Sequence, residues 1–285
     1  MVLANLNDVL TKANKEYYAV GAFNASDLST ARGIIAAAEE LNSPVILQFA
    51  EVHEEFMSIE MAANVFLDLA EQASVPVVVH LDHGENFGTI MGVIKLGFSS
   101  VMVDTSSFPF DENVAQVKEF VKIAHTLGVT VEGELGVMNA EDGSGTLRYD
   151  QMEDSYTNPE EAELFVERTG ADALAIAFGT VHGLYREQPN LNFERIKEIK
   201  ERVGIPLVMH GGSGLTDSEY RQSIENGINK INYYSTMAHD VTNQLREYLK
   251  NNEKAALTDV DVKLQEFVKE NIMTKIKVFG SQGKA

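Results

Sequence analysis

Three histidines have the position and spacing of a metal site. His83 follows the run VPVVVHLD, His182 follows ALAIAFGTV, and His210 closes IPLVM. Three neutral imidazoles with one open coordination position are a ligand set of catalytic zinc. A single histidine at a strand end is more often a hydrogen-bonded structural residue, but three in corresponding positions favour a metal. The pattern does not separate zinc from cobalt or manganese.

Carboxylates accompany these histidines. Asp82 directly precedes His83, which predicts a general acid or base near the metal or, alternatively, a group that orients a ligand. Glu132 and Glu134 are two residues apart and share one face of a strand. We expect Glu134 to hold the metal, a ligand histidine or a water, and Glu132 to pair inside the protein. The other histidines are expected to be structural, with His80 packed or partnering a ligand: His53, His80, His125 and His239.

Two segments are suited to phosphate. HGGSG at 210–214 contains small residues that leave backbone N–H groups free to converge on an anion. NYYS at 232–235 precedes a predicted helix, with Ser235 as a cap or phosphate donor. Both segments follow the last two predicted strands, which is the recurrent phosphate site of (β/α)8 barrels.

The elements that position these residues alternate along the chain. Eight short apolar runs predict strands at 18–23, 44–50, 75–81, 99–103, 129–134, 172–178, 205–210 and 228–232. Stretches with helical periodicity lie between them, including 28–41, 58–73, 111–127, 159–169, 193–202 and 217–226. Runs such as VPVVV indicate strands buried on both faces, so we predict an α/β fold, a (β/α)8 TIM barrel. A doubly wound open sheet is the alternative.

The 285 residues show no linker and no change in composition, which favours one domain over 1–285. Residues 136–157 form a long segment that we expect to be a mobile active-site loop. Residues 252–285 lie beyond the eighth unit and are predicted to form a C-terminal helical extension, packed on the barrel or on another subunit.

Composition restricts the partners. The 23 basic and 43 acidic residues give a net charge of −20, which disfavours nucleic acids and anionic membranes. No apolar run is long enough to span a membrane, and the first residues lack the apolar block of a signal peptide. The absence of cysteine fits a reducing compartment. We therefore expect a cytoplasmic protein.

Five motifs occur in a characteristic order, namely HLDHG at 80–84, EGELG at 132–136, AFGTVHGLY at 177–185, HGGSG at 210–214 and NYYS at 232–235. With the ending FGSQGKA, they make the whole chain resemble the class II ketose-bisphosphate aldolases. The resemblance implies a (β/α)8 barrel, one zinc ion per chain, and reversible aldol cleavage of a ketose phosphate to dihydroxyacetone phosphate. A monovalent cation is left open.

The resemblance also implies roles for individual residues. It places the metal on His83, His182 and His210, with Glu134 nearby as an alternate ligand or outer partner. It makes Asp82 the acid or base at the C4 oxygen. Glu141 corresponds to the loop glutamate that moves protons at C3, although NAEDG at 139–143 is one residue shorter than the family's usual segment. The implied substrate and phosphate contacts are Gly183, Arg186, Gly211, Ser213, Asn232 and Ser235, with Asn232 also near the reacting carbons.

The motifs depart from the family pattern where the far end of the substrate would lie. Many members have a serine after the second strand, and this chain has Ala50 followed by Glu51. We therefore expect a ketose 1-phosphate aldolase whose distal group need not be phosphate, for example acting on 6-deoxy-6-sulfofructose 1-phosphate. A fructose- or tagatose-1,6-bisphosphate aldolase is the alternative.

Other classes stay open at this stage. These are a barrel metal hydrolase, an aldolase that uses an imine on Lys230, and a noncatalytic phosphosugar-binding barrel. The expected partner is a small phosphosugar, and the expected assembly is a homodimer or homotetramer.

Overall fold

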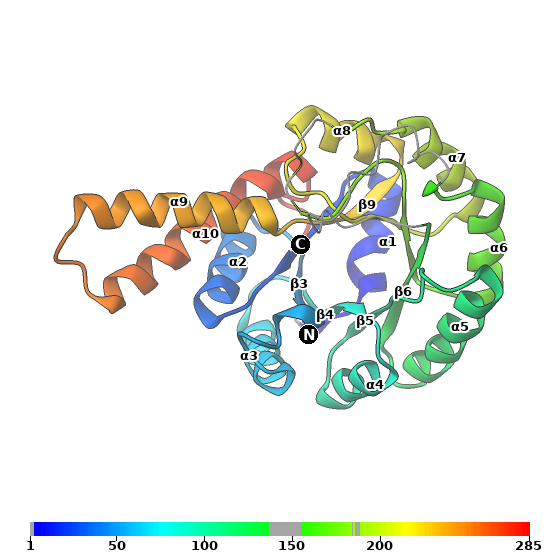
Figure 1. Ribbon diagram of the computed structural model, residues 1–285, viewed down its shortest axis with the longest axis horizontal. Helices are drawn as coiled ribbons and strands as arrows, with labels where there is room; N and C mark the ends of the chain where they lie inside the picture. Colours follow the sequence, from blue (N-terminus) through cyan, green and yellow to red (C-terminus); the bar gives the residue numbers. More distant parts are fainter. Residues whose placement is uncertain (1–2, 137–154, 184, 186–188) are drawn as a thin grey trace.

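Eight parallel strands close into a barrel surrounded by helices (Figure 1). The computed structural model describes residues 3–136, 155–183, 185 and 189–285. Neighbouring strands pair from β2 round to β9, and β9 pairs with β2, so the ring has no free edge. The barrel strands are β2 (Val20–Asn24), β3 (Val45–Ala50), β4 (Val77–Gly84), β5 (Ser100–Val103), β6 (Thr130–Leu135), β7 (Ala173–Ile176), β8 (Leu207–Met209) and β9 (Ile228–Asn232). This is the predicted TIM barrel, and the open sheet is wrong.

All eight predicted strands are present, and their ends differ for an identifiable reason. The run predicted at 75–81 continues as β4 to Gly84, because Asp82 still pairs with Ala50 of β3 and Gly84 with Val103 of β5. The apolar run of β4 therefore ends before its backbone pairing does, because the last residues of the strand are polar and belong to the site.

Helices follow the strands and cover the outside of the ring. They are α2 (Leu28–Glu40), α3 (Ile59–Gln72), α4 (Phe87–Leu96), α5 (Phe110–Thr126), α6 (Pro159–Thr169), α7 (Phe193–Val203) and α8 (Asp217–Asn226), with a short 3-10 helix η1 (Glu51–His53). Side chains cap several of them; Asp27, for example, accepts a hydrogen bond from the Thr30 N–H at the start of α2. Helices α6 and α7 end at Gly170 and Gly204, whose backbones are left-handed.

The N-terminal end of the barrel is closed. Helix α1 (Leu6–Glu16) lies within the ring in the view of Figure 1 and buries its apolar face. This face meets inward side chains of the strands, in a cluster that contains Leu6, Leu10, Ala22, Ile46, Val78, Ala173 and Val208. Strand β1 (Leu3–Ala4), which the sequence did not reveal, pairs with β4 below the point where β5 joins it. The inside of the ring is therefore filled at this end, and the cavity that reaches the three histidines lies at the opposite end.

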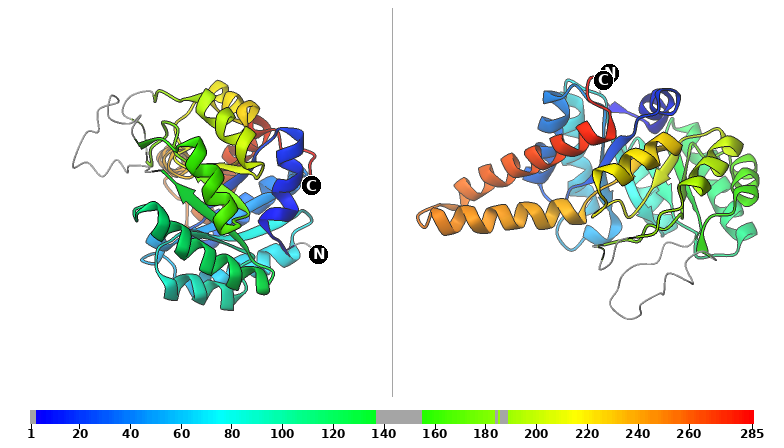
Figure 2. Two further views of the ribbon diagram at one scale, coloured as in Figure 1. Left: turned by 90° about the vertical axis from the view of Figure 1, so that its right-hand side faces the viewer. Right: turned by 90° about the horizontal axis from the view of Figure 1, so that it is seen from above.

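The last two helices form an arm. Helices α9 (Ser235–Asn251) and α10 (Leu257–Phe279) run side by side and project from the barrel (Figures 1 and 2). Helix α10 returns to pack on α2, where a Cβ at Gly33 would lie 2.8 Å from the Val268 side chain. The predicted helix in 252–285 is therefore present. None of the described helices is long and apolar enough to cross a membrane.

Candidate active site

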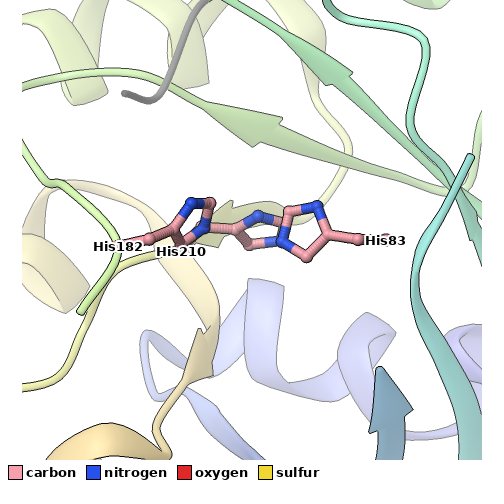
Figure 3. A group of neighbouring side chains, drawn as sticks. All are labelled: His83, His182 and His210. Carbon is pink, nitrogen blue, oxygen red and sulfur yellow. The ribbon is translucent and has the colours of Figure 1, made fainter. Parts of the chain in front are cut away.

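The three histidines meet at the open end of the barrel. His83 lies in β4, His182 follows β7, and His210 follows β8. Their side chains point towards one another (Figure 3), with ring centroids 4.6 Å apart for His83 and His210 and 5.0 Å apart for His83 and His182. One nitrogen from each ring lies within 4.8 Å of the others. Three strand ends that are distant in sequence thus supply one group of donors.

Carboxylates orient two of these rings. Nδ1 of His83 lies 2.7 Å from Asp104 Oδ2, and Nε2 of His210 lies 2.9 Å from Glu132 Oε1. These bonds leave Nε2 of His83 and Nδ1 of His210 available. Such outer carboxylates fix the orientation of metal-binding histidines and raise their basicity. Asp104 was missed in the sequence, although it directly follows the apolar run of β5, as the recognised residues follow theirs.

The nitrogens of this group fit a divalent cation. Nε2 of His182 and Nδ1 of His210 are buried without a hydrogen-bond partner, and unpaired buried polar atoms are costly. Glu134 Oε2 lies 3.1 Å from His210 Nδ1, and His83, Asp104 and Glu134 also form a possible ligand group. A cation bound to the three histidines would satisfy the two unpaired nitrogens.

Charges in the site favour a positive species at its centre. Burial lowers the pKa of His210, but the neighbouring carboxylates of Glu132 and Glu134 outweigh this and raise it to about 10. Burial, with the neighbouring His210 and His83, lowers the pKa of His182 to about 3. The carboxylates therefore stabilise positive charge beside His210, while His182 is held as a neutral donor.

The backbone of His83 is strained. Its φ is 51°, in the left-handed region that side chains other than glycine seldom adopt. Such positions cost on the order of 1–3 kcal/mol and cluster at functional sites. In this conformation the His83 ring lies beside those of His182 and His210.

Asp82 is held as a carboxylate beside the histidines. Its Oδ1 lies 4.0 Å from His83 Nε2. The amides of Asn24 and Asn232 donate to its two oxygens at 2.8 and 2.9 Å. Burial raises its pKa, but the charges of His83, His210 and Lys230 and the bond from Asn24 outweigh this, so its pKa lies well below the ordinary value.

Two more polar residues complete the support of Asp82. Asn24 ends β2, and its Oδ1 accepts a hydrogen bond of 2.7 Å from Nε2 of Gln48 in β3. Sequence reasoning missed both, although each is a polar residue inside or ending an apolar run. The bond from Gln48 fixes the orientation of the Asn24 amide, so that the NH2 group of Asn24 faces Asp82 and donates to it.

Lys230 has a structural position. It is fully buried in β9, 2.9 Å from Glu132 Oε2, and donates to Asn232 Oδ1 at 2.8 Å. It is not among the residues that line the cavity. A lysine that forms an imine must reach the substrate carbonyl, so this geometry argues against the imine hypothesis. Glu132 is paired inside the barrel, as predicted from the sequence.

A cavity of about 680 Å³ opens above the histidines. Five of the residues predicted to contact substrate phosphate line it, and these are Gly183, Gly211, Ser213, Asn232 and Ser235. Helix α9 begins there, and no side chain caps its first turn, so its N–H groups are free to bind an anion. At Gly211 the φ is +62° and a Cβ would collide with the Val181 carbonyl, so only glycine fits.

Several residues singled out in the sequence remain to be placed. Glu141 and Arg186 are outside the described residues, as is most of the segment 136–157. His53, expected to be structural, is buried and also lines the cavity. His125 is in α5, with Nε2 2.8 Å from Asp172.

The fold is a (β/α)8 barrel, and at its open end three histidines that could hold a metal ion lie beside a cavity. The family model of class II fructose-bisphosphate aldolase matches residues 4–284. The chain belongs to this family and is therefore an aldolase, a lyase that acts on carbohydrate phosphates.

Relatives agree over full length. The uncharacterised protein YdjI of Escherichia coli is 37% identical over 285 residues and covers 100% of both chains. The fructose-bisphosphate aldolase of Geobacillus stearothermophilus is 37% identical over 293 residues, covering 100% of this chain and 99% of its own. The crystal structure of the YdjI aldolase has a TM-score of 0.87 and 36% identity, covering 99% of each chain.

Proposed function

We propose that this aldolase reversibly cleaves a ketose 1-phosphate into dihydroxyacetone phosphate and an aldehyde. One observation carries the proposal, which is the ionised carboxylate of Asp82 at 4.0 Å from a nitrogen of the three-histidine group. Asp82 would serve as a proton acceptor beside the proposed metal, and it lines the same cavity as Ser235 at the start of α9. Aldol cleavage needs these three features together.

The metal centre is proposed to hold zinc on His83, His182 and His210, with Glu134 as an alternate ligand or outer partner. Zinc supplies Lewis-acid stabilisation of the negative charge that develops on the substrate's oxygens. Asp104 and Glu132 hold two of the ligand rings in place, which limits the reorganisation needed when substrate binds.

The proton transfers are assigned to carboxylates. Asp82 accepts the proton of the C4 hydroxyl while the C3–C4 bond breaks and the C4–O bond becomes a carbonyl. The electron pair of the broken bond remains with the dihydroxyacetone phosphate half. Glu141 then returns a proton to C3, a role taken from the family resemblance. Asn232, whose Oδ1 is occupied by Lys230, offers its amide hydrogens to Asp82 and the reacting end.

The phosphate of the dihydroxyacetone half is proposed to bind at the start of α9. The backbone of Gly183 and Gly211 and the side chains of Ser213 and Ser235 would hold it, with Arg186 adding charge. Backbone donors and a helix N-terminus supply local positive potential, which a chain of net charge −20 otherwise lacks.

Two alternatives are left for the group at the far end of the substrate, opposite the dihydroxyacetone phosphate half. A non-phosphate end, as in 6-deoxy-6-sulfofructose 1-phosphate, is one candidate, and a fructose or tagatose 1,6-bisphosphate is the alternative. We also propose a homodimer or homotetramer, supported by the projecting arm of α9 and α10 and testable by light scattering.

The test measures release of dihydroxyacetone phosphate from a panel of ketose 1-phosphates and 1,6-bisphosphates, detected through a coupled dehydrogenase. Each substrate is tested with the untreated enzyme, after removal of metal with EDTA, and after zinc is added back. Release that EDTA abolishes and zinc restores would support the proposal. If one zinc binds per chain but no substrate is cleaved, the barrel metal hydrolase becomes the better hypothesis.

A further inference from the structure

The cavity has a second end, away from the start of α9. It is formed where β3, β4 and β5 finish, and its lining includes Glu51, Glu85, Asn86 and Ser106. His53, in η1 after β3, lines the cavity between this end and Tyr234 at the start of α9. In a closed ring of eight strands, β4 lies four strands from β8, so this end faces the HGGSG loop across the histidine group. This inference rests on the proposed function, which places the phosphate at α9 and the reacting carbons at the histidines. The remaining carbons of the substrate then extend to this second end.

This second end is acidic. Among the described residues that line the cavity there is no lysine or arginine, whereas Glu51 and Glu85 both lie here. The backbone N–H of Glu85 donates to Glu51 Oε2 at 3.3 Å and is therefore engaged. A phosphate or sulfonate placed here would meet like charge, and none of the described lining residues is a lysine or arginine that could offset it.

Glu51 is firmly held in this position. Its Oε1 accepts hydrogen bonds from Asn86 Nδ2 at 2.7 Å and from Thr89 Oγ1 at 3.0 Å. Among the described residues, its Oε2 receives just the longer bond from the Glu85 backbone. A carboxylate has about four acceptor positions, so Oε2 can accept further hydrogen bonds. Hydroxyl groups can donate to it, and fully ionised phosphates cannot.

His53 supplies a second polar group. Its side chain is 7% exposed, and its Nδ1 has no hydrogen-bond partner. The ring packs against Tyr234, with centroids 4.9 Å apart, at the edge of the same cavity. Burial lowers the pKa of His53, so the ring is neutral at physiological pH and brings no positive charge for an anion.

We propose that Glu51 and His53 form a subsite for the uncharged, hydroxyl-bearing tail of a ketose 1-phosphate, and that Glu51 disfavours tails that end in phosphate or sulfonate. This narrows the proposed substrates to ketose 1-phosphates with an uncharged tail and disfavours the sulfonated and bisphosphate candidates named above. Glu51 is the specificity-determining residue, because it presents a fixed acceptor and a negative charge together. His53 positions the tail through a neutral ring.

The experiment compares cleavage of fructose 1-phosphate, fructose 1,6-bisphosphate and 6-deoxy-6-sulfofructose 1-phosphate by the wild-type enzyme and the Glu51→Gln variant. The wild type should have the highest kcat/KM for fructose 1-phosphate. Glu51→Gln keeps an oxygen for Asn86 and Thr89 but removes the charge. The Glu51→Gln substitution should raise kcat/KM about tenfold, relative to that for fructose 1-phosphate, for both fructose 1,6-bisphosphate and 6-deoxy-6-sulfofructose 1-phosphate.

Two controls separate this role from a general effect. Glu54→Gln removes an exposed charge three residues away that does not line the cavity, and it should leave the substrate ratio unchanged. His53→Phe keeps the packing on Tyr234 and should raise KM for fructose 1-phosphate with little change in kcat. Thermal unfolding checks that each variant folds.

A wild type that cleaves the bisphosphate at least as efficiently as fructose 1-phosphate overturns the inference while leaving the proposed function intact. So does a Glu51→Gln variant with an unchanged substrate ratio. Absence of triose phosphate from every substrate overturns the proposed function, and the inference with it.

Discussion

Lys230 Nζ lies 2.9 Å from Glu132 Oε2 in the fully buried interior of the barrel. The pair joins two parts of the site, because Lys230 also donates to Asn232, which holds Asp82, while Glu132 holds His210. A continuous path of polar contacts therefore connects the proposed proton acceptor with a proposed metal ligand.

Breaking this pair should be costly. Lys230→Met leaves Glu132 buried without its cation, and we expect a loss of about 3–5 kcal/mol in the free energy of unfolding. Urea unfolding measures it. Lys263→Met removes a lysine from an exposed pair with Glu266 and should cost below about 1 kcal/mol. Equal losses for both variants would contradict the role given to the buried pair.

Removal of a proposed ligand should release the metal. His83→Ala and His182→Ala each delete one of three donors, so zinc should be lost on dialysis and cleavage should fall to background. The measurement is zinc per chain by elemental analysis. His125→Ala, in α5 and paired with Asp172, should retain the metal. Full zinc retention in both ligand variants would disprove the assignment.

Asp104 should act on the metal only through His83. Asp104→Ala removes the carboxylate 2.7 Å from His83 Nδ1, and zinc affinity should fall about 10- to 100-fold. Competition with a fluorescent chelator measures the affinity. Asp111→Ala, which removes an exposed partner of Arg168, is the matched control and should not change it.

Asp82→Asn tests the proton acceptor. The amide keeps the shape of the carboxylate but cannot accept the C4 proton, so kcat should fall about 10²- to 10⁴-fold. Zinc content should stay at the wild-type value, since the three histidines are untouched. A variant with near-normal kcat would show that another group moves this proton.

The loop at Gly211 allows a test with matched backbone strain. Gly211 and Gly204 have φ of +62° and +68°, but a Cβ at Gly211 collides with Val181 while one at Gly204 meets nothing within 4 Å. Gly204→Ala should cost about 1–2 kcal/mol from left-handed strain alone. Gly211→Ala should cost more and should weaken binding of dihydroxyacetone phosphate, measured by calorimetry. Similar effects at both positions would argue against a shaped phosphate loop.

The barrel was predictable because a short apolar run followed by a stretch of helical periodicity recurs eight times along the chain, and each such unit can be recognised from its own residues. The ends of the strands were harder to predict, because β4 continues through Asp82 and His83 after its apolar run stops. The site shows the same division. The three histidines stand at strand ends in the sequence, whereas the partners of Asp82 and His83 become visible only when the ring closes. Asn24 and Asp82 are 58 positions apart, and His83 and Asp104 are 21 apart. No local pattern encodes such pairings.

Helix α9 belongs to the cavity at Ser235 and to the projecting arm at Asn251. Its 17 residues form a rod of about 25 Å, one end of which lies at the cavity where the substrate phosphate is proposed to bind. A shortened form of this protein can therefore be engineered only by trimming matching turns from the far ends of α9 and α10. A deletion nearer the barrel would remove the packing of α10 on α2 and α9, which holds α9 in its direction.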